Sequence, residues 1–447
     1  MAGAEPSSAW SRAASCRFVF AGYRWHAASG ELLLDYELDG YPLCERFRFP
    51  LPNDRRAIPD AALNSAMSLL HWVAGVSYWK AGCPQQLTFG ARAPSAEQAD
   101  WLNRLYREGL AEFAWHNHLA PERFEVFRSA SQSPTDAGPA GLDGAYLVPM
   151  GGGKDSLVAW SRLKRQGLAP ITVQVGSSAL IRAVAERAGG PHLVIERQVD
   201  PALAGLNAAG AWNGHVPITA INAAALIVLA LLHGSRGVVF ANERSADEAT
   251  LSDEHGRPVN HQFAKSLRFE RMLDDWVRRW IAADLQVFSL LRRDRELAIC
   301  REFAGLTRFH DVFSSCNRNF HLDGPRTGRW CGRCPKCHFV FLGLAPFMSA
   351  AALERIFGAN LLADTDILDG FRSLLALDGR KPFECVGEAA EARAAIRTLA
   401  GRPEWRDHGV VRTLNAELAG LEVPELDELC RPGGEHLIPE ALLHASG

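Results

Sequence analysis

A glycine-rich loop constrains the fold of this chain more than any other stretch. The loop is Gly151-Gly152-Gly153-Lys154-Asp155-Ser156, and the apolar segment 146–150 before it is typical of a short buried strand. Residues 157–163, which follow it, are typical of a helix. A strand, a glycine turn and a helix together direct backbone N–H groups and a helix N-terminus toward an anion. The sequence therefore predicts a phosphate-binding loop in an α/β fold.

The side chains of this glycine loop narrow the class of ligand. The glycines allow close approach of a phosphate, Lys154 is expected to add a mobile cation, and Ser156 adds a hydroxyl donor. The Asp155 carboxylate suits such a site only if a divalent cation such as Mg²⁺ lies between it and the phosphate. The spacing differs from a Walker A loop and from a dinucleotide fingerprint. It resembles the PP-loop of ATP pyrophosphatases, which transfer AMP from ATP to an acceptor; a glycine turn without a ligand is the alternative.

Strand-like and helix-like segments alternate after the loop and predict a doubly wound parallel sheet of the PP-loop type. Strands are expected at 171–175, 193–196 and 237–241. Ligands of such sheets bind beyond the carboxyl ends of the strands. The polar residues at these ends are therefore expected to face one crevice together with the glycine loop. We assign Gly176 and Ser177 to ATP binding. We assign Asn242, Glu243 and Arg244 to substrate binding.

The pattern of the 447 residues predicts four parts. Residues 1–130 combine alternating apolar positions with two helical patterns, which predicts an N-terminal α+β domain. Residues 131–143 are rich in small residues and proline, as linkers are. Residues 144–345 are expected to hold the ATP-binding loop and a zinc-stabilised loop. Residues 346–447 are expected to form a mostly helical C-terminal region.

Composition and charge argue against nucleic-acid and membrane partners. The 48 Lys and Arg residues and 51 Asp and Glu residues give a net charge of −3, so no basic field attracts nucleic acid. The longest apolar run, residues 220–232, is too short to span a bilayer. The first sixteen residues lack the apolar core of a signal peptide. We therefore expect a cytoplasmic protein with reduced cysteines; the oligomeric state is not indicated.

Four of the ten cysteines have the spacing of metal ligands. Cys316 precedes two overlapping C-x-x-C pairs formed by Cys331, Cys334 and Cys337, and four thiolates predict a tetrahedral structural zinc. His338 is an alternative fourth ligand, although it directly follows a cysteine. An iron–sulfur cluster or a redox pair would also use such cysteines. The arrangement resembles the zinc site of the 7-cyano-7-deazaguanine synthases.

With these motifs assembled, the chain resembles the MurL family over most of its length. The family consists of UDP-N-acetyl-α-D-muramoyl-L-alanyl-L-glutamate epimerases. The resemblance implies an isomerase that uses ATP and Mg²⁺ to invert the terminal L-glutamate of UDP-MurNAc-L-Ala-L-Glu, in peptidoglycan synthesis and hence in cell-wall growth, cell shape and cell division. The matching stretches are residues 75–78, 151–158, 211–215, 242–246, 259–262, 313–321, 329–347 and 381–388.

An AMP-forming loop has a chemical purpose in such an epimerase. A free carboxylate makes the neighbouring α-proton hard to remove, because the product would be a dianion. Adenylation of the α-carboxylate removes that charge and makes the Cα–H acidic. The proton then leaves either directly, through an enolate, or after the alanyl carbonyl oxygen has closed an oxazolone. The sequence leaves this choice open.

Several residues in or beside the matching stretches are candidates for roles in the reaction. A general acid or base needs a pKa near the working pH, which favours histidine among the four candidates, His215, His261, Lys265 and Cys385. Cations for the substrate's carboxylates and diphosphate are Arg244, Arg318 and Lys381, since arginine binds anions bidentately. The competing function is another AMP-forming PP-loop enzyme that makes a nitrile or an amide. An RNA-modification factor and a non-catalytic zinc module agree less well with the net charge and with the glycine loop.

Overall fold

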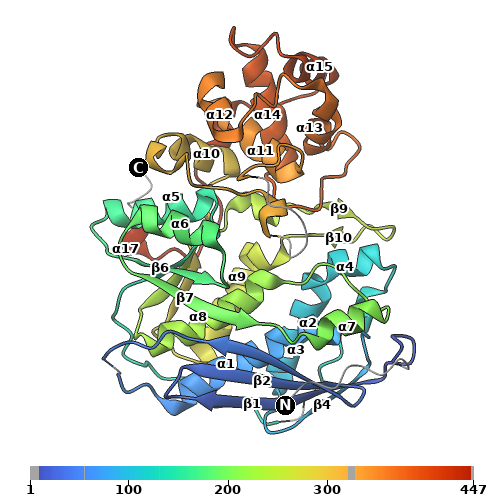
Figure 1. The fold of residues 1–447 in the computed structure, drawn as a ribbon, viewed down its shortest axis with the longest axis vertical. Helices are drawn as coiled ribbons and strands as arrows, with labels where there is room; N and C mark the ends of the chain where they lie inside the picture. Colours follow the sequence, from blue (N-terminus) through green and yellow to red (C-terminus); the bar gives the residue numbers. More distant parts are fainter. Residues whose placement is uncertain (1–9, 55, 130, 321–327, 444–447) are drawn as a thin grey trace.

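The computed structural model describes residues 10–54, 56–129, 131–320 and 328–443. A nine-stranded sheet runs through the molecule in the order β11-β8-β5-β6-β7-β3-β2-β1-β4 (Figure 1). A separate two-stranded ribbon pairs β9 (Leu251–Ser252) with β10 (Pro258–Val259). The strands of the large sheet are β1 (Arg17–His26), β2 (Glu31–Leu38), β3 (Tyr41–Arg48), β4 (Gln86–Phe89), β5 (Leu147–Pro149), β6 (Ile171–Val175), β7 (His192–Gln198), β8 (Gly237–Phe240) and β11 (Gln286–Ser289).

The sheet is parallel on one side and mainly antiparallel on the other. Neighbouring strands are parallel from β11 to β7, whereas β7 pairs antiparallel with β3, and β1, β2 and β3 form an antiparallel meander. Tight turns with positive φ at Gly30 and at Asp39-Gly40 keep these three strands adjacent. The prediction of an α/β fold with a large, mostly parallel sheet is confirmed. The N-terminal strands continue this sheet because β3 pairs with the edge that β7 would otherwise leave open.

Side chains of the parallel strands alternate between two hydrophobic cores. Leu147 and Val238 belong to the core that contains α1 (Asp60–Ala74) and α8 (Ile218–Leu232). Their neighbours Val148 and Val239 belong to the core on the other face. This is the period of two that a strand imposes on its side chains. Helix α8 is apolar on nearly all sides because it packs between α1 and the sheet, and no helix in the described ranges is long and apolar enough to cross a membrane.

The remaining helices are distributed over the two cores and the C-terminal end. The first core also contains α2 (Val76–Trp79), α3 (Ala96–Gly109), α4 (Ala111–His116), α7 (Ala202–Ala208) and α9 (Leu267–Trp280). The second contains α5 (Lys154–Arg165), α6 (Ala179–Ala188), α10 (Glu296–Ala304) and the C-terminal helices. Those are α11 (Pro335–Leu344), α12 (Ala350–Phe357), α13 (Leu368–Leu374), α14 (Ala389–Ala400), α15 (Gly409–Glu417), α16 (Leu426–Leu429) and α17 (Glu440–Leu443).

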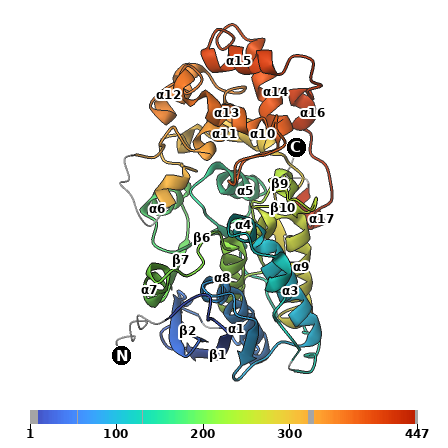
Figure 2. The same cartoon turned by 90° about the vertical axis from the view of Figure 1, so that its right-hand side faces the viewer.

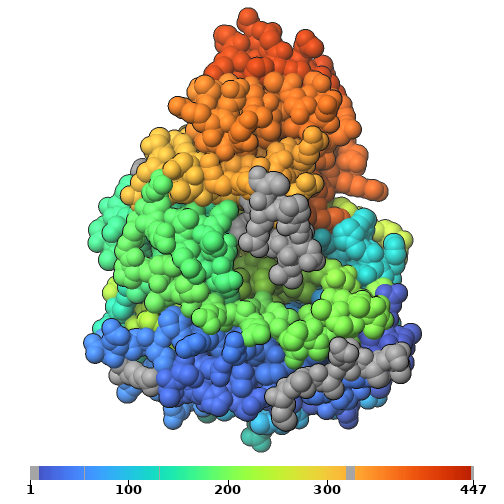
Figure 3. Space-filling view, viewed as in Figure 1, coloured from blue at the N-terminus to red at the C-terminus, as the bar shows by residue number. Residues whose placement is uncertain are grey.

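The C-terminal helices α11 to α15 stack above the parallel part of the sheet and form the narrower end of the molecule (Figures 2 and 3). Between residues 346 and 443 the structure contains helices, turns and irregular segments but no strand. The segment 131–143, expected to be a linker, is held by the Asp284 carboxylate, which accepts hydrogen bonds from the backbone N–H groups of Ala140 and Leu142. The division into four parts stays a prediction.

Candidate active site

The glycine loop has the predicted strand–turn–helix geometry. Strand β5 ends at Pro149, α5 begins at Lys154, and Gly153 is its N-cap residue. Gly152 has φ +81°, and a β carbon there would lie 2.6 Å from the Leu180 side chain. A β carbon on Gly153 would lie 2.5 Å from the Ser315 hydroxyl oxygen. The positive φ makes glycine necessary at position 152, whereas a β carbon at position 153 would force the Ser315 hydroxyl to move. The N-terminus of α5 is left open to an anion.

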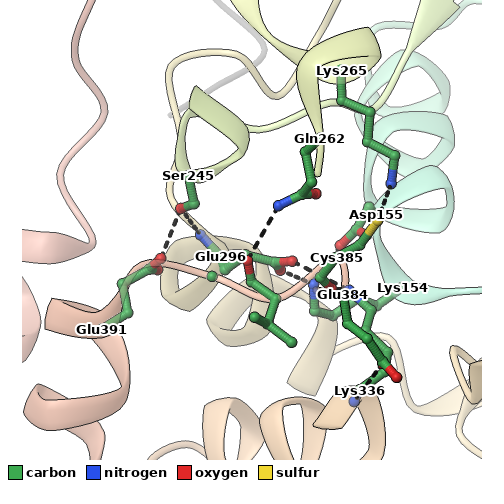
Figure 4. Close-up of polar contacts among 12 residues, drawn as sticks. Lys154, Asp155, Ser245, Gln262, Lys265, Glu296, Lys336, Glu384, Cys385 and Glu391 are labelled. Atoms are coloured by element: carbon green, nitrogen blue, oxygen red, sulfur yellow. Dashed lines mark hydrogen bonds and ion pairs between the residues drawn. The ribbon is translucent and has the colours of Figure 1, made fainter. Parts of the chain in front are cut away.

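Lys154 is not the mobile cation predicted from the sequence. Its side chain is fully buried and its ammonium forms ion pairs with Asp155 and with Glu296 of α10 (Figure 4). Burial alone would lower the pKa of Lys154, but these two carboxylates raise it well above its usual value. The sequence could not reveal this because Glu296 lies far along the chain and reaches the loop only through the packing of α10 against α5.

Asp155 and Glu243 place negative charge beside the glycine loop. The Asp155 side chain is 26% exposed; burial raises its pKa, but Lys154 and Lys336 lower it by more, so it is ionised. Glu243 is buried, and its burial and the charges of Glu296 and Asp155 raise its pKa to about 7. A divalent cation would relieve this repulsion, since carboxylate oxygens are the ligands that Mg²⁺ prefers. The donor set therefore fits the Mg²⁺ expected at Asp155.

The four cysteines predicted as metal ligands come together in space. The sulfur atoms of Cys316, Cys331, Cys334 and Cys337 all lie within 4.8 Å of one another. Cys337 Sγ lies 3.4 Å from Cys334 Sγ and 3.7 Å from Cys331 Sγ. Tetrahedral zinc with Zn–S bonds of about 2.3 Å requires sulfur separations of about 3.8 Å, so this four-cysteine site fits zinc.

His338 takes no part in the four-cysteine site. Its Nε2 lies 3.0 Å from the Gly332 carbonyl oxygen, and its ring stacks on Phe371 with a centroid separation of 4.6 Å. The histidine therefore packs against the loop and a neighbouring helix. This geometry favours the four cysteines over a ligand set that contains His338.

The four candidate acid–base residues converge on one place although they are far apart in the sequence. Lys265 ends the short 3₁₀ helix Phe263–Lys265, and its ammonium lies 3.2 Å from the sulfur of Cys385, which belongs to the loop between α13 and α14 (Figure 4). His261 contacts the same sulfur. The ring of His215, in the segment before α8, lies 4.5 Å from the ring of His261.

Glu112 of α4 completes this group and was missed by sequence reasoning. Its carboxylate pairs with Nδ1 of His261 and lies 3.5 Å from Nδ1 of His215. We call these five residues the Cys385 cluster: Glu112, His215, His261, Lys265 and Cys385. Glu112, His215 and His261 have donor atoms close enough for a metal ion, but the hydrogen-bonded ion pair between His261 and Glu112 already accounts for their proximity.

Charge neighbours set the protonation states in the Cys385 cluster. Burial raises the pKa of the Cys385 thiol, but the Lys265 charge and contact with His261 overcome it and lower the pKa to about 5. Burial lowers the pKa of His261, whereas its bonds to Cys385 and Glu112 raise it to about 9. Burial and the positive charge of His261 lower the pKa of His215 to about 4. At neutral pH the cluster thus holds a thiolate, an imidazolium and a neutral imidazole.

Lys336 links the Cys385 cluster to the glycine loop and was also missed. Its ammonium contacts the Cys385 carbonyl oxygen and lies 3.6 Å from the Glu296 carboxylate, and its backbone N–H donates to Glu384 (3.1 Å). Its position between two predicted zinc ligands was the one available signal. Lys265 interacts electrostatically with both Cys385 and Asp155. The Cys385 thiol and Asp155 of the glycine loop therefore both lie near the same lysine charge.

The residues assigned to the substrate are more dispersed. Arg244 lies against the backbone of Gly433 and Gly434, and Lys381 pairs with Glu248. Arg318 is exposed in the 3₁₀ helix Asn317–Phe320, and Asn242 is half-buried after β8. Residues 321–327 of the same loop lie outside the described residues. The substrate contacts of these side chains stay predictions.

Gly176 and Ser177, assigned to ATP, line a cavity of about 220 Å³ at the end of β6. Two arginines of β3, Arg46 and Arg48, and Arg197 of β7 line it as well. The cavity therefore lies where the N-terminal strands join the parallel sheet. Glu196 lines it too, and Arg197 is paired with the buried Glu45, so the lining carries charges of both signs.

Two family models of known proteins together match most of the chain. The family model of the MurL N-terminal domain matches residues 10–290, and that of the MurL C-terminal domain matches residues 312–428. The chain belongs to the MurL family. The family predicted from the motifs is therefore confirmed.

Three relatives carry the name UDP-N-acetyl-alpha-D-muramoyl-L-alanyl-L-glutamate epimerase. The Xanthomonas oryzae pv. oryzae protein is 44% identical over 431 residues, which cover 95% of each chain. The Micromonospora sp. protein is 40% identical over 434 residues, 94% of this chain and 96% of the relative. The Salinispora tropica protein is 39% identical over 446 residues, 96% of this chain and 95% of the relative.

The candidate site draws on both MurL regions. Glycine-loop residues, Glu112, His261 and Lys265 lie in the N-terminal match, whereas Cys385 and the four-cysteine site lie in the C-terminal match. The Cys385 cluster forms only where the two regions pack together. Any chemistry at this cluster thus requires both MurL regions.

Proposed function

We propose that this chain inverts the terminal L-glutamate of UDP-MurNAc-L-Ala-L-Glu to D-glutamate in an ATP-dependent reaction, in the cytoplasm, during peptidoglycan precursor synthesis. The observation that carries the proposal is the convergence of a thiolate, two histidines and a lysine beside the glycine loop. The shared name of three relatives at 39–44% identity supports the same substrate.

The glycine loop would hold the nucleotide in this reaction. ATP supplies the AMP group that neutralises the α-carboxylate. The backbone N–H groups at the start of α5 would face the phosphates, and Asp155, with Glu243 nearby, would hold Mg²⁺. Lys154 keeps Asp155 in place through their ion pair. The four-cysteine site would hold a structural zinc, because four protein ligands leave no open position for chemistry.

The two histidines have opposite protonation states, which suits inversion. His215 is neutral at pH 7 and can accept the α-proton, whereas His261 is protonated and can donate one. Their rings are adjacent and Glu112 lies against both. Each turnover leaves a proton on His215 and removes one from His261, and exchange with water restores the two states.

The test combines product analysis with isotope exchange. The protein is incubated in heavy water with ATP, Mg²⁺ and UDP-MurNAc-L-Ala-L-Glu. We expect D-glutamate that carries deuterium at Cα, with one AMP and one pyrophosphate for each inversion. Asp155→Asn should suppress both signals, whereas Asp143→Asn, an exposed change before the loop, should not. Production of ADP and phosphate, full exchange without nucleotide, or formation of an amide or nitrile from added ammonia would contradict the proposal.

A further inference from the structure

Cys385 has more partners than a proton-transfer group needs. Its sulfur contacts the Lys265 ammonium at 3.2 Å and the ring of His261, and that ring is held on its other side by the Glu112 carboxylate. A thiol, a histidine and a carboxylate in series are the arrangement of an activated cysteine nucleophile. Each partner comes from a different element, so the series exists only in the folded chain.

The position of the sulfur suits attack on an activated carboxyl group. Cys385 is half-buried and therefore reachable, and it is held in the ionised form by two neighbouring cations. Lys265 also interacts with Asp155, the residue expected to hold Mg²⁺ at the nucleotide phosphates. The carboxyl group that receives AMP would therefore lie close to the thiolate.

We propose that the Cys385 thiolate takes the activated glutamyl group from AMP and holds it as a thioester while the α-carbon is inverted. The inference rests on the proposed function. The sulfur attacks the carboxyl carbon of the acyl adenylate, the C–S bond forms, and the C–O bond to phosphate breaks. AMP leaves with that electron pair, so no oxidant or reductant is required.

A thioester serves inversion because sulfur donates less electron density into the carbonyl than oxygen does, which makes the α-proton more acidic. His215 removes that proton and His261 supplies one to the opposite face. Water then attacks the thioester carbon, its oxygen enters the product carboxylate, and the C–S electron pair returns to Cys385 as thiolate. Both protons of that water are released, because the carboxylate and the thiolate are the two products.

The thioester can be observed directly. Wild-type protein is mixed with ATP, Mg²⁺ and UDP-MurNAc-L-Ala-L-Glu, quenched in acid within milliseconds to seconds, and digested for mass spectrometry. We expect the peptide that contains Cys385 to gain the mass of the substrate acyl group, and neutral hydroxylamine to remove it. His215→Gln should increase the trapped amount, because inversion is then slower than acylation. Absence of the adduct from both proteins, while wild type inverts glutamate, would overturn the proposal.

Variants separate this step from adenylation. Cys385→Ala should retain substrate-dependent exchange of pyrophosphate into ATP but lose deuterium incorporation at Cα by at least about a hundredfold. Cys44→Ala, which removes another half-buried thiol, should leave both rates unchanged. Deuterium incorporation by Cys385→Ala above a tenth of the wild-type rate would overturn the thioester. Failure of wild type to exchange pyrophosphate would instead contradict the proposed function, so the two failures are distinguishable.

Alkylation measured without ATP tests whether the Cys385 thiol lies beside the bound glutamyl carboxylate. UDP-MurNAc-L-Ala-L-Glu alone should protect Cys385, but not Cys44, from alkylation by iodoacetamide, because the glutamyl carboxylate would cover the sulfur. UDP-MurNAc-L-Ala, which lacks that glutamate, should protect it much less. Equal alkylation with and without the full substrate at saturating concentration would overturn the placement.

Discussion

The backbone N–H of Ser314 donates a 2.9 Å hydrogen bond to the carbonyl oxygen of Gly152. The hydroxyl oxygen of Ser314 in turn accepts the backbone N–H of Cys316 at 3.1 Å. The glycine loop is therefore tied to the first residue of the four-cysteine site through a single serine. A metal ion there would fix the loop that is expected to bind ATP, although it would lie outside the reaction itself.

Removal of the metal should weaken ATP binding as well as stability. We expect about one zinc per chain in the purified protein, and Cys334→Ser should lose it and lower the melting temperature. ATP affinity should fall about tenfold, a usual size for coupling between sites. Elemental analysis, thermal unfolding and ATP titration check this, with the exposed Cys16→Ser as the control. Folded protein without zinc but with full ATP affinity would contradict the link.

Loss of the buried ion pair between Lys154 and Glu296 should lower the free energy of unfolding more than loss of an exposed ion pair. Glu296→Gln leaves the buried ammonium with Asp155 as its remaining partner, and the free energy of unfolding should fall by about 3–5 kcal/mol. Glu37→Gln removes the partner of Arg17 at the surface and should cost about 0–1 kcal/mol. Urea unfolding of the two variants gives the comparison. Equal losses would show that Lys154 is hydrated in solution.

The sequence predicted the local parts of this site well and its long-range parts poorly. The glycine loop, with its flanking strand and helix, and the spacing of the four cysteines are local patterns whose geometry follows from few residues. Glu112 and Glu296 reach the site through helix packing, and no local pattern marks them. The candidates His215, His261, Lys265 and Cys385 came from resemblance; their mutual contacts, which define their protonation, required the fold.

The sheet also combines local features that the sequence predicts with a long-range pairing that it does not predict. Period-two alternation in residues 16–50 predicts strands, and hairpin turns order them, but neither specifies the edge that they join. Pairing of Arg46 with Gln198 and of Arg48 with Glu196 makes the N-terminal strands part of the main sheet. Such a contact spans about 150 positions, so only the folded chain reveals it.

Cys385 should react as a thiolate well below the pH at which ordinary cysteines do. Two cations contact its sulfur, Lys265 and His261, and the charge of Lys336 lies near it. Cations favour the charged form, so the pKa falls to about 5. Alkylation by iodoacetamide should therefore stay nearly constant from pH 8 to pH 6 and decline only near pH 5. For an ordinary thiol the rate falls about tenfold per pH unit over this range.

Cys44 provides the matched comparison. Burial and the Asp35 carboxylate raise its pKa to about 11, so its alkylation should be slow and should rise steeply with pH. Lys265→Met should make Cys385 behave more like Cys44, with a rate at pH 6.5 at least about tenfold lower. Parallel pH profiles for the two thiols in the wild-type protein would contradict the ionised state of Cys385.

The two histidines of the Cys385 cluster should separate proton removal from proton return. His261→Gln lacks the acid but keeps neutral His215, so the L-substrate should exchange its α-proton with heavy water while inversion falls by about a hundredfold or more. His215→Gln lacks the base, so exchange and inversion of the L-substrate should fall together.

His116→Gln, which alters an exposed histidine 3.7 Å from the same Glu112 carboxylate, controls for loss of a neighbouring charge. Proton NMR of the recovered L-epimer, combined with chiral analysis of glutamate, measures the two rates separately. If both variants lose exchange and inversion in equal proportion, the histidines do not divide the roles between two faces of the α-carbon.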